Sequence, residues 1–197
     1  MSLPQSVALC DVGPRDGFQF EEQFIPTDRK VDVITALADA GLPRIQVTSF
    51  VHPKWVPQMK DAEAVCSRLP DRADVTYAGL ALNQRGLERA HAAGLSQVDL
   101  SIATHDRHSQ DNANRTVDEA VAQADDMVRD AHEKGRTVQM GFLTGFEYQA
   151  PDDTTIDQVV EMGRQFADQG VESLSLADST SLEQPRMIKE RVREEQD

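Results

Sequence analysis

The sequence predicts an α/β protein with parallel strands, arranged as a TIM (β/α)8-type barrel of which about six βα units are present. Apolar runs of strand length alternate with helical patterns along the whole chain. No Gly-x-Gly-x-x-Gly follows the first run, so the fingerprint of a dinucleotide-binding sheet is absent. Polar residues gather where strands should end, as at the active face of a barrel: Arg15, Asp16, Thr48, Ser49, Asn83, Thr104, His105 and Asp178.

A complete barrel has eight strands, and this sequence supplies six. We therefore expect a single domain over residues 1–197 that is incomplete at its C-terminal side. Its sheet should have two open parallel edges, which parallel sheets rarely leave uncovered.

The first half of the chain predicts three strands, each followed by a helix. Thr27 is the expected N-cap of the first helix and Gly41 its stop, and the third helix ends at a glycine in the same way. The first helix should bury the stripe Val31, Ile34, Leu37 and Ala38. The predicted strands are 7–12, 44–50 and 74–82, and the predicted helices are 27–41, 61–69 and 83–94.

The second half continues the alternation. A polar loop is expected at 104–115, because the segment is rich in Asn and Asp. The predicted strands are 97–103, 137–143 and 171–177, and the predicted helices are 116–135, 155–170 and a C-terminal one over 185–197 with Pro185 in its first turn.

Composition excludes several classes of partner. The formal net charge of −14 argues against nucleic acid and against anionic membrane surfaces. No apolar run approaches the roughly 20 residues of a membrane helix, and no secretory leader opens the chain. Cys10 and Cys66 predict reduced thiols in a cytoplasmic protein, with Cys10 buried in the first strand.

The first candidate site is the pair Arg15 and Asp16, which follows the first strand between Gly13 and Gly17. The glycines should let the backbone bend so that both side chains reach the barrel mouth. There, Asp16 would suit a hard divalent cation, and Arg15 would hold a carboxylate or stabilise a developing enolate. The alternative is a surface turn with a local ion pair.

Two further segments carry candidate groups. In the loop 48–61, Lys54 would meet an anionic ligand while Trp55 and Met59 pack over the barrel rim; the alternative is a rigid connector stiffened by its prolines. In 104–115, His105 and His108 are spaced for a metal, although hydrogen-bonded surface histidines are the favoured interpretation.

Three motifs together resemble the 3-hydroxy-3-methylglutaryl-CoA lyase family: "VGPRDGFQ", "TSFVHPKWVPQM" and "HSQDNANRT". The resemblance runs along essentially the whole chain, to the "LADS" that ends the sixth strand. It implies a TIM barrel that uses Mg²⁺ or Mn²⁺ to cleave a 3-hydroxyacyl-CoA. The products would be acetyl-CoA and a keto acid such as acetoacetate.

The resemblance also implies roles for single residues. Asp16 matches the metal ligand of strand one, and Arg15 matches the residue that stabilises the enolate. Asp178 resembles the acid that takes part in proton transfer. Substrate binding is expected of Gln19, Thr48, Ser49 and Lys54.

The sequence departs from the family pattern in several places. Gln46 replaces an acid on strand two, and Phe20 stands where Asn is usual. Ser179 and Glu183 alter the loop after Asp178, and the fifth strand lacks the family's cysteines. The family's His-x-His pair, its Asn ligand and its catalytic cysteine loop would lie beyond residue 197, so a metal should bind weakly or not at all to this chain.

These departures leave two alternatives beside a lyase. One is a catalytically incomplete barrel fragment that acts only through association with another chain, as a homo-oligomer or by pairing its open edges. The other is a related lyase or aldolase with a different acyl-CoA or hydroxy-acid substrate, since Phe20, Gln46 and the loop after Asp178 would reshape the pocket.

Overall fold

The computed structural model describes residues 5–146, 154–179, 184–186 and 188–189. The chain forms two compact units, Met1–Val98 and Asp99–Asp197, and each is described by itself. The predicted parallel α/β class is confirmed, because the strands that pair within each unit do so in parallel and are joined by helical crossovers.

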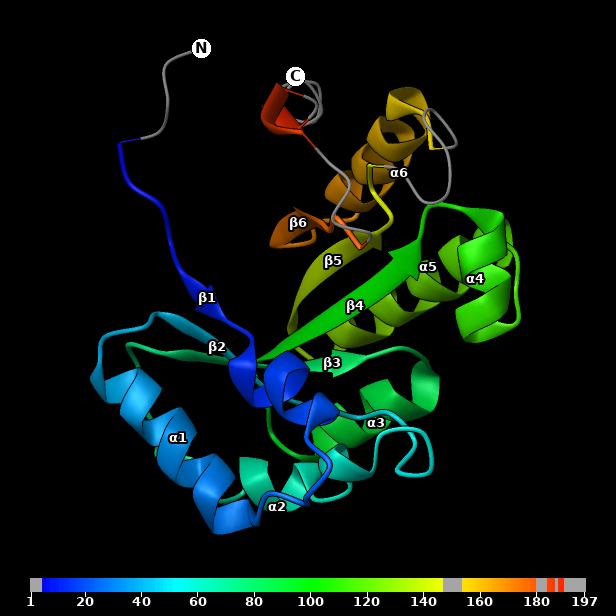
Figure 1. Ribbon diagram of the computed structural model, residues 1–197. Coiled ribbons are helices and arrows are strands. Elements are labelled where there is room, and N and C mark those ends of the chain that lie inside the picture. The colour runs from blue at the N-terminus through cyan, green and yellow to red at the C-terminus, as the bar shows by residue number, and fades with distance from the viewer. Residues whose placement is uncertain (1–4, 147–153, 180–183, 187, 190–197) are drawn as a thin grey trace. The chain divides into compact units, whose positions relative to one another are not determined.

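The first unit is built on strands β1 (Cys10–Asp11), β2 (Arg44–Ser49) and β3 (Thr76–Ala81), ordered as in the sequence (Figure 1). Cys10 is level with Arg44, and Arg44 with Thr76. The register of β2 against β3 shifts between Gln46 and Thr48. Five of the six residues of β2 are buried, as expected of a strand covered on both faces.

Helices and turns connect these strands. Positive φ at Gly41 and Gly94, after the first and third helices, confirms the predicted glycine stops. The core contains Ile34 and Ala38 of α1 with Ile45 and Val47 of β2. The elements are η1 (Gly13–Gly17), η2 (Phe18–Phe20), α1 (Thr27–Asp39), η3 (Pro57–Met59), α2 (Ala62–Cys66) and α3 (Gln84–Ala92).

The second unit begins at Asp99, within strand β4, and includes the strands β5 and β6. Phe142 and Phe166 pack in its core with ring centroids 6.1 Å apart. Thr116 and Thr155 each begin a helix with a capping box. The elements are β4 (Gln97–Ala103), α4 (Asp106–Ala113), α5 (Val117–Glu133), β5 (Thr137–Leu143), α6 (Ile156–Asp168) and β6 (Ser173–Leu176).

Some predicted elements were wrong in detail. The expected loop 104–115 contains helix α4, which the His105 side chain caps and which ends at Asn114 in left-handed backbone. Thr27 is the first helical residue rather than the N-cap, since the amide of Lys30 donates to the carbonyl of Pro26; the Thr27 hydroxyl donates to Asp61 Oδ2 at 2.7 Å. Only Cys10–Asp11 of the predicted first strand is paired. Of 185–197, Pro185, Arg186, Ile188 and Lys189 have helical backbone, and the rest lies outside the described residues.

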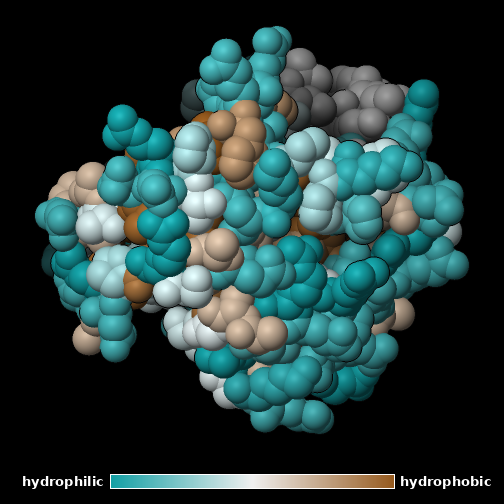
Figure 2. All heavy atoms as spheres, turned by 90° about the horizontal axis from the view of Figure 1, so that it is seen from below, coloured by the Kyte–Doolittle hydropathy of each residue, from teal (hydrophilic) through white to brown (hydrophobic). Residues whose placement is uncertain are grey.

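The surface agrees with the acidic, strongly charged composition. The face seen in Figure 2 is covered mainly by hydrophilic side chains, among which apolar ones are scattered. Within the described part of the chain, no helix combines the length and the apolar character needed to cross a bilayer.

The two cysteines differ in environment, and the predicted burial of Cys10 is wrong. Cys10 is exposed at the start of the sheet, where it accepts a hydrogen bond from Arg44 Nη1 at 3.4 Å. Cys66, at the end of α2, is partly buried, and burial raises the pKa of its thiol to about 12.

We therefore expect a thiol reagent at pH 8 to alkylate the exposed Cys10 about 100-fold faster or more than Cys66, because only the thiolate reacts and burial raises the pKa of the Cys66 thiol. Peptide mapping by mass spectrometry after timed alkylation would measure both rates on one sample. Denaturation in urea should equalise the two rates. Equal rates in the folded protein would contradict the difference in burial.

Candidate active site

The chain turns into helical backbone directly after β1, and this turn creates the candidate site. The amides of Arg15 and Asp16 both donate to the carbonyl of Val12, at 3.1 and 2.7 Å. Neither Gly13 nor Gly17 has positive φ, so the expected use of glycine flexibility is wrong. At Gly13 an added Cβ would lie 3.0 Å from Oδ1 of Asp11, so the Asp11 side chain would have to shift by a few tenths of an ångström to admit one.

The helical turn brings four polar side chains together. Arg15 Nη1 lies 2.6 Å from Asp16 Oδ1, and Arg15 Nε donates to Gln46 Oε1 from the neighbouring strand β2. Gln19 Nε2 donates to the same Asp16 oxygen at 3.0 Å. We call Arg15, Asp16, Gln19 and Gln46 the Arg15 cluster.

The side chains of the Arg15 cluster differ in their exposure to solvent. Gln46 is 4% exposed, the Arg15 side chain 20% and the Asp16 side chain 48%. The guanidinium is thus bound by a buried amide at Nε and by a carboxylate at Nη1, and the Asp16 carboxylate reaches solvent. A fixed, partly desolvated cation of this kind suits an anion that forms beside it. Gln46, which departs from the family pattern, therefore binds Arg15, a contact that the sequence does not reveal.

Thr48 and Ser49 end β2 and are buried, each 2% exposed. The Thr48 hydroxyl lies 3.6 Å from Met59 Sδ, and Ser49 Oγ accepts from the amide of Val51 at 3.4 Å. Both residues therefore help to hold the long loop that follows β2. Their expected contact with substrate stays a prediction.

The loop after β2 differs from expectation at one aromatic residue. Met59 is buried as predicted, but Trp55 is 77% exposed and does not pack over the core. The ammonium of Lys54 lies 5.6 Å from the centre of the Trp55 ring, within the range of a cation–π contact. Lys54 is exposed and able to meet an anionic ligand.

A hollow of about 490 Å³ in the first unit lies beside this loop, where β2 and β3 end. Arg85, Arg89 and His52 contribute its charged and titratable side chains, and no acidic residue lines it. Arg89 is paired with Glu63 at 2.6 Å, and this hydrogen bond lowers the pKa of the Glu63 carboxyl. The hollow has the sign of charge that a phosphorylated ligand requires.

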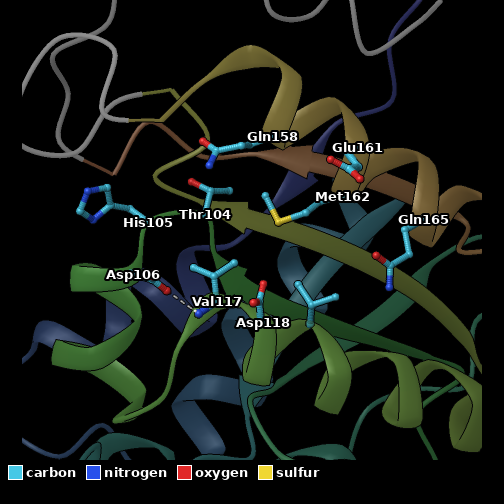
Figure 3. A pocket seen from close by; sticks show the side chains of 10 residues that line it. Thr104, His105, Asp106, Val117, Asp118, Gln158, Glu161, Met162 and Gln165 are labelled. Atoms are coloured by element: carbon cyan, nitrogen blue, oxygen red, sulfur yellow. Dashed lines mark hydrogen bonds between the residues drawn. The ribbon is translucent and has the colours of Figure 1, made fainter.

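The second unit has a groove of opposite character (Figure 3). Its volume is about 510 Å³, and its lining includes Asp106, Asp118 and Glu161 but no Lys or Arg. Asp106 Oδ1 accepts from the amide of Val117 at 2.8 Å, so it caps the start of α5. This groove suits a phosphorylated ligand poorly.

The remaining candidates also lie in the second unit. Asp178 is partly exposed two residues after β6, and its neighbour Ser179 accepts from the amide of Thr144 at 3.0 Å. His105 Nδ1 accepts from the amide of Arg107 at 3.2 Å, and burial lowers the pKa of His108. The His105 contact agrees with the favoured interpretation of hydrogen-bonded surface histidines, whereas His108 is partly buried rather than at the surface. Glu183 lies outside the described residues.

Among the described residues, the expected ligand of a divalent metal is Asp16. Asp16 provides the hard oxygen that Mg²⁺ or Mn²⁺ prefers, and its carboxylate is half exposed. Among the described residues, no group of three or more His, Cys, Asp or Glu could hold a metal ion. These residues alone therefore do not form a complete metal site.

Comparison with known proteins agrees with the motifs. The HMGL-like family model matches residues 6–196. Hydroxymethylglutaryl-CoA lyase YngG of Bacillus subtilis is 34% identical over 188 residues, which cover 95% of this chain and 63% of that protein. The human cytoplasmic 3-hydroxy-3-methylglutaryl-CoA lyase is 32% identical over 95% of this chain and 50% of its own length.

Solved structures give the same result for the fold. The crystal structure of the B. subtilis HMG-CoA lyase superposes with a TM-score of 0.92 at 33% identity, covering 98% of this chain and 65% of that one. An HMG-CoA lyase from Acinetobacter, solved with coenzyme A and 3-methylmalate, gives a TM-score of 0.87 at 28% identity over 94% of this chain and 60% of that one. The predicted barrel-type fold is thereby confirmed, and the chain spans less than two thirds of these relatives. By the extent of the match, this chain belongs to the HMGL-like family.

Proposed function

We propose that this chain carries part of the active site of a hydroxymethylglutaryl-CoA lyase-like enzyme. The reaction would be cleavage of a carbon–carbon bond in a 3-hydroxyacyl-CoA, giving acetyl-CoA and a keto acid such as acetoacetate. The observation that carries the proposal is the Arg15 cluster, which follows the C-terminal end of β1 and includes Gln46 from within β2, in a chain 34% identical to a named lyase.

The proposed roles follow from where charge moves during cleavage. The electrons of the breaking bond pass to the thioester carbonyl and form an enolate, while the 3-hydroxyl loses its proton and becomes the new ketone. Arg15 stabilises the enolate oxygen, because its charge is permanent and Gln46 and Asp16 hold its orientation. Gln19, Thr48, Ser49 and Lys54 are proposed to bind substrate, and Asp178 to transfer the proton.

The proposed cofactor is Mg²⁺ or Mn²⁺, with Asp16 as one ligand. A bound divalent cation would polarise the oxygen atoms of the substrate and lower the barrier to losing the hydroxyl proton. The described residues contain no group of three or more His, Cys, Asp or Glu that could hold a metal, so we propose that further ligands come from the rest of the complete protein.

An acyl-CoA is the proposed substrate class because of the cationic hollow beside Lys54. Arg85 lines it and is exposed, at the same C-terminal edge of the strands as the Arg15 cluster. Its charge is opposite to the net charge of −14, so it supports local binding of phosphate groups. A cytoplasmic location is proposed, and the two free cysteines are compatible with it.

The proposed alternative is a barrel that acts only through association, and one observation favours it. Val7 and Leu9, just before β1, are 74% and 62% exposed, which is unusual for apolar residues leading into a sheet. Light scattering of the complete gene product would report homo-oligomers or edge pairing. A monodisperse monomer would count against this alternative.

The decisive test of the lyase is an assay of the complete gene product with hydroxymethylglutaryl-CoA, with Mg²⁺, with Mn²⁺ and after chelation. We expect equal amounts of acetyl-CoA and acetoacetate with metal, and loss of both with chelator. Cleavage of a related 3-hydroxyacyl-CoA but not of hydroxymethylglutaryl-CoA would favour a lyase of different substrate. No cleavage of any such thioester would remove the proposal.

A further inference from the structure

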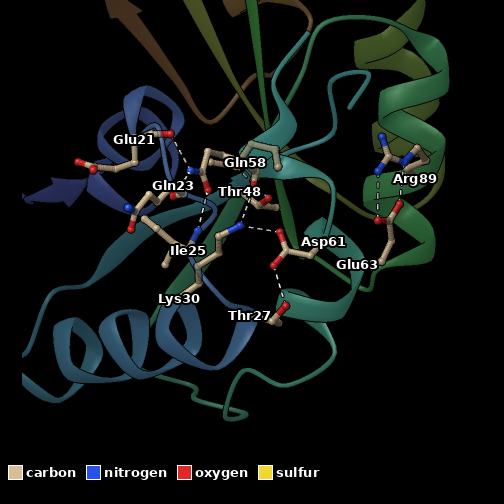
Figure 4. A network of polar contacts seen from close by, with 11 residues as sticks. Glu21, Gln23, Ile25, Thr27, Lys30, Thr48, Gln58, Asp61, Glu63 and Arg89 are labelled. Atoms are coloured by element: carbon tan, nitrogen blue, oxygen red, sulfur yellow. Dashed lines mark hydrogen bonds and ion pairs between the residues drawn. The ribbon is translucent and has the colours of Figure 1, made fainter. Parts of the chain in front are cut away.

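The side-chain amide of Gln58, in η3, forms all three of its hydrogen bonds with one segment of main chain. Its Nε2 donates to the carbonyls of Glu21 and Gln23 at 2.7 and 2.6 Å, and its Oε1 accepts from the amide of Ile25 at 3.1 Å (Figure 4). Gln58 is 4% exposed. A buried amide satisfied in this way fixes its partner segment, since moving that segment would leave buried polar groups without partners.

A buried ion pair fixes Gln58 in turn. Lys30 Nζ, from α1, donates to the carbonyl of Gln58 and lies 2.6 Å from Asp61 Oδ1. Thr27 Oγ1 donates to the other oxygen of Asp61 at 2.7 Å. Lys30 is 2% exposed, so this anchor has little freedom to rearrange.

The segment that Gln58 holds continues directly from the Arg15 cluster. Glu21 directly follows η2, and Gln19 within η2 donates to Asp16. On the other side, Met59 follows Gln58 and its sulfur lies 3.6 Å from the Thr48 hydroxyl. Gln58 is therefore hydrogen-bonded to the segment 21–25 that follows the Arg15 cluster, and it is adjacent in sequence to Met59, which contacts Thr48.

We infer that Gln58 is a positioning residue for the Arg15 cluster: by holding residues 21–25 it fixes η1 and η2 against β2. It acts through main chain and is not proposed to touch the substrate. The expected effect of Gln58 on turnover rests on the proposed function. Its expected effect on the mobility of residues 13–25 rests only on its hydrogen bonds.

The test compares Gln58→Ala with the unaltered complete gene product by hydrogen exchange and by steady-state kinetics. Amides of residues 13–25 should exchange about tenfold faster or more, because the clamp no longer opposes local opening. With hydroxymethylglutaryl-CoA, kcat should fall about tenfold or more while KM changes less than about threefold, because the loss is in orientation. If Gln58→Ala does not fold, Gln58→Met keeps the side-chain length without the hydrogen bonds and takes the same measurements.

Gln97→Ala is the matched control. Gln97 is also 4% exposed and accepts one side-chain hydrogen bond, from Arg44 Nε at 3.1 Å. It begins β4 and so lies at the end of the strands away from the C-terminal edge. Its loss should leave exchange at 13–25 unchanged and kcat within about twofold.

Unchanged exchange at residues 13–20 in the Gln58 variants would overturn the positioning role, whatever their activity. Faster exchange with an unchanged kcat, or an equal fall of kcat in Gln97→Ala, would overturn it as well. If the unaltered protein cleaves no thioester, the proposed function fails alone, and the exchange measurement still decides whether Gln58 orders the cluster.

Discussion

Arg15→Ala in the complete gene product is expected to lower kcat by about 10²- to 10³-fold, the usual cost of removing one group that stabilises a developing oxyanion. The guanidinium is oriented by Gln46 and by Asp16 at 2.6 Å, so its stabilisation of the enolate requires no rearrangement. Initial rates of acetyl-CoA release, measured at saturating substrate, would give the effect.

Arg72→Ala is the control for this variant. Arg72 is also an arginine bound to carboxylates, Asp39 and Asp74, and its side chain is 26% exposed against 20% for Arg15. It precedes β3 and so lies at the opposite edge of the strands. We expect kcat within about twofold of the unaltered protein. Activity near that of the unaltered protein in Arg15→Ala would sink the role proposed for Arg15.

Lys30→Met should lower the free energy of unfolding by about 3–5 kcal/mol, the largest stability effect that we expect from one substitution. The change removes the ammonium and leaves the Asp61 carboxylate, 11% exposed, without its counter-ion. It also removes the donor to the carbonyl of Gln58 and the cation that lies 4.6 Å from the Phe24 ring. Urea unfolding followed by circular dichroism would measure the loss.

Two further variants separate burial from charge. Lys134→Met breaks the pair with Asp130, 2.7 Å apart but with the lysine side chain 44% exposed, and should cost less than about 1 kcal/mol. The double variant Lys30→Met, Asp61→Leu removes both buried charges and should recover part of the loss. Equal costs for Lys30→Met and Lys134→Met would show that burial of the first pair has no consequence for stability.

Much of the fold was predictable because the local signals agree with one another. Strands 97–103 and 137–143 were predicted to the residue, since apolar residues recur at every second position in each. Thr116 and Thr155 begin helices where a capping box stands in the sequence. In such places propensity, capping and apolar period favour the same structure.

Helix α4 was missed because its residues are poor helix formers that favour turns. It is stabilised by contacts that span the following loop, including the bond from the Val117 amide to Asp106. Composition alone favours the turn, and the tertiary contact reverses the preference.

The candidate site was predictable in its residues but not in its contacts. The motif around Arg15 and Asp16 is visible in the sequence, whereas the bond from Arg15 to Gln46 joins residues 31 positions apart. The burial of Lys30 was missed for the same reason, since a lysine is expected in solvent unless a distant carboxylate pairs with it. Trp55 was placed wrongly because a large aromatic side chain alone favours burial.

Strands that pair in the order of the sequence have a consequence for how the protein is made. β1 pairs with β2, β2 with β3, and β5 with β6. Each of these strands can therefore pair with the strand synthesised immediately before it. Cys10 and Arg44 are 34 positions apart, so this pairing closes a smaller loop, at less cost in entropy, than pairing between strands distant in the sequence would. We therefore expect the sheet to grow strand by strand during synthesis, with the Arg15 cluster assembled once β2 has docked on β1.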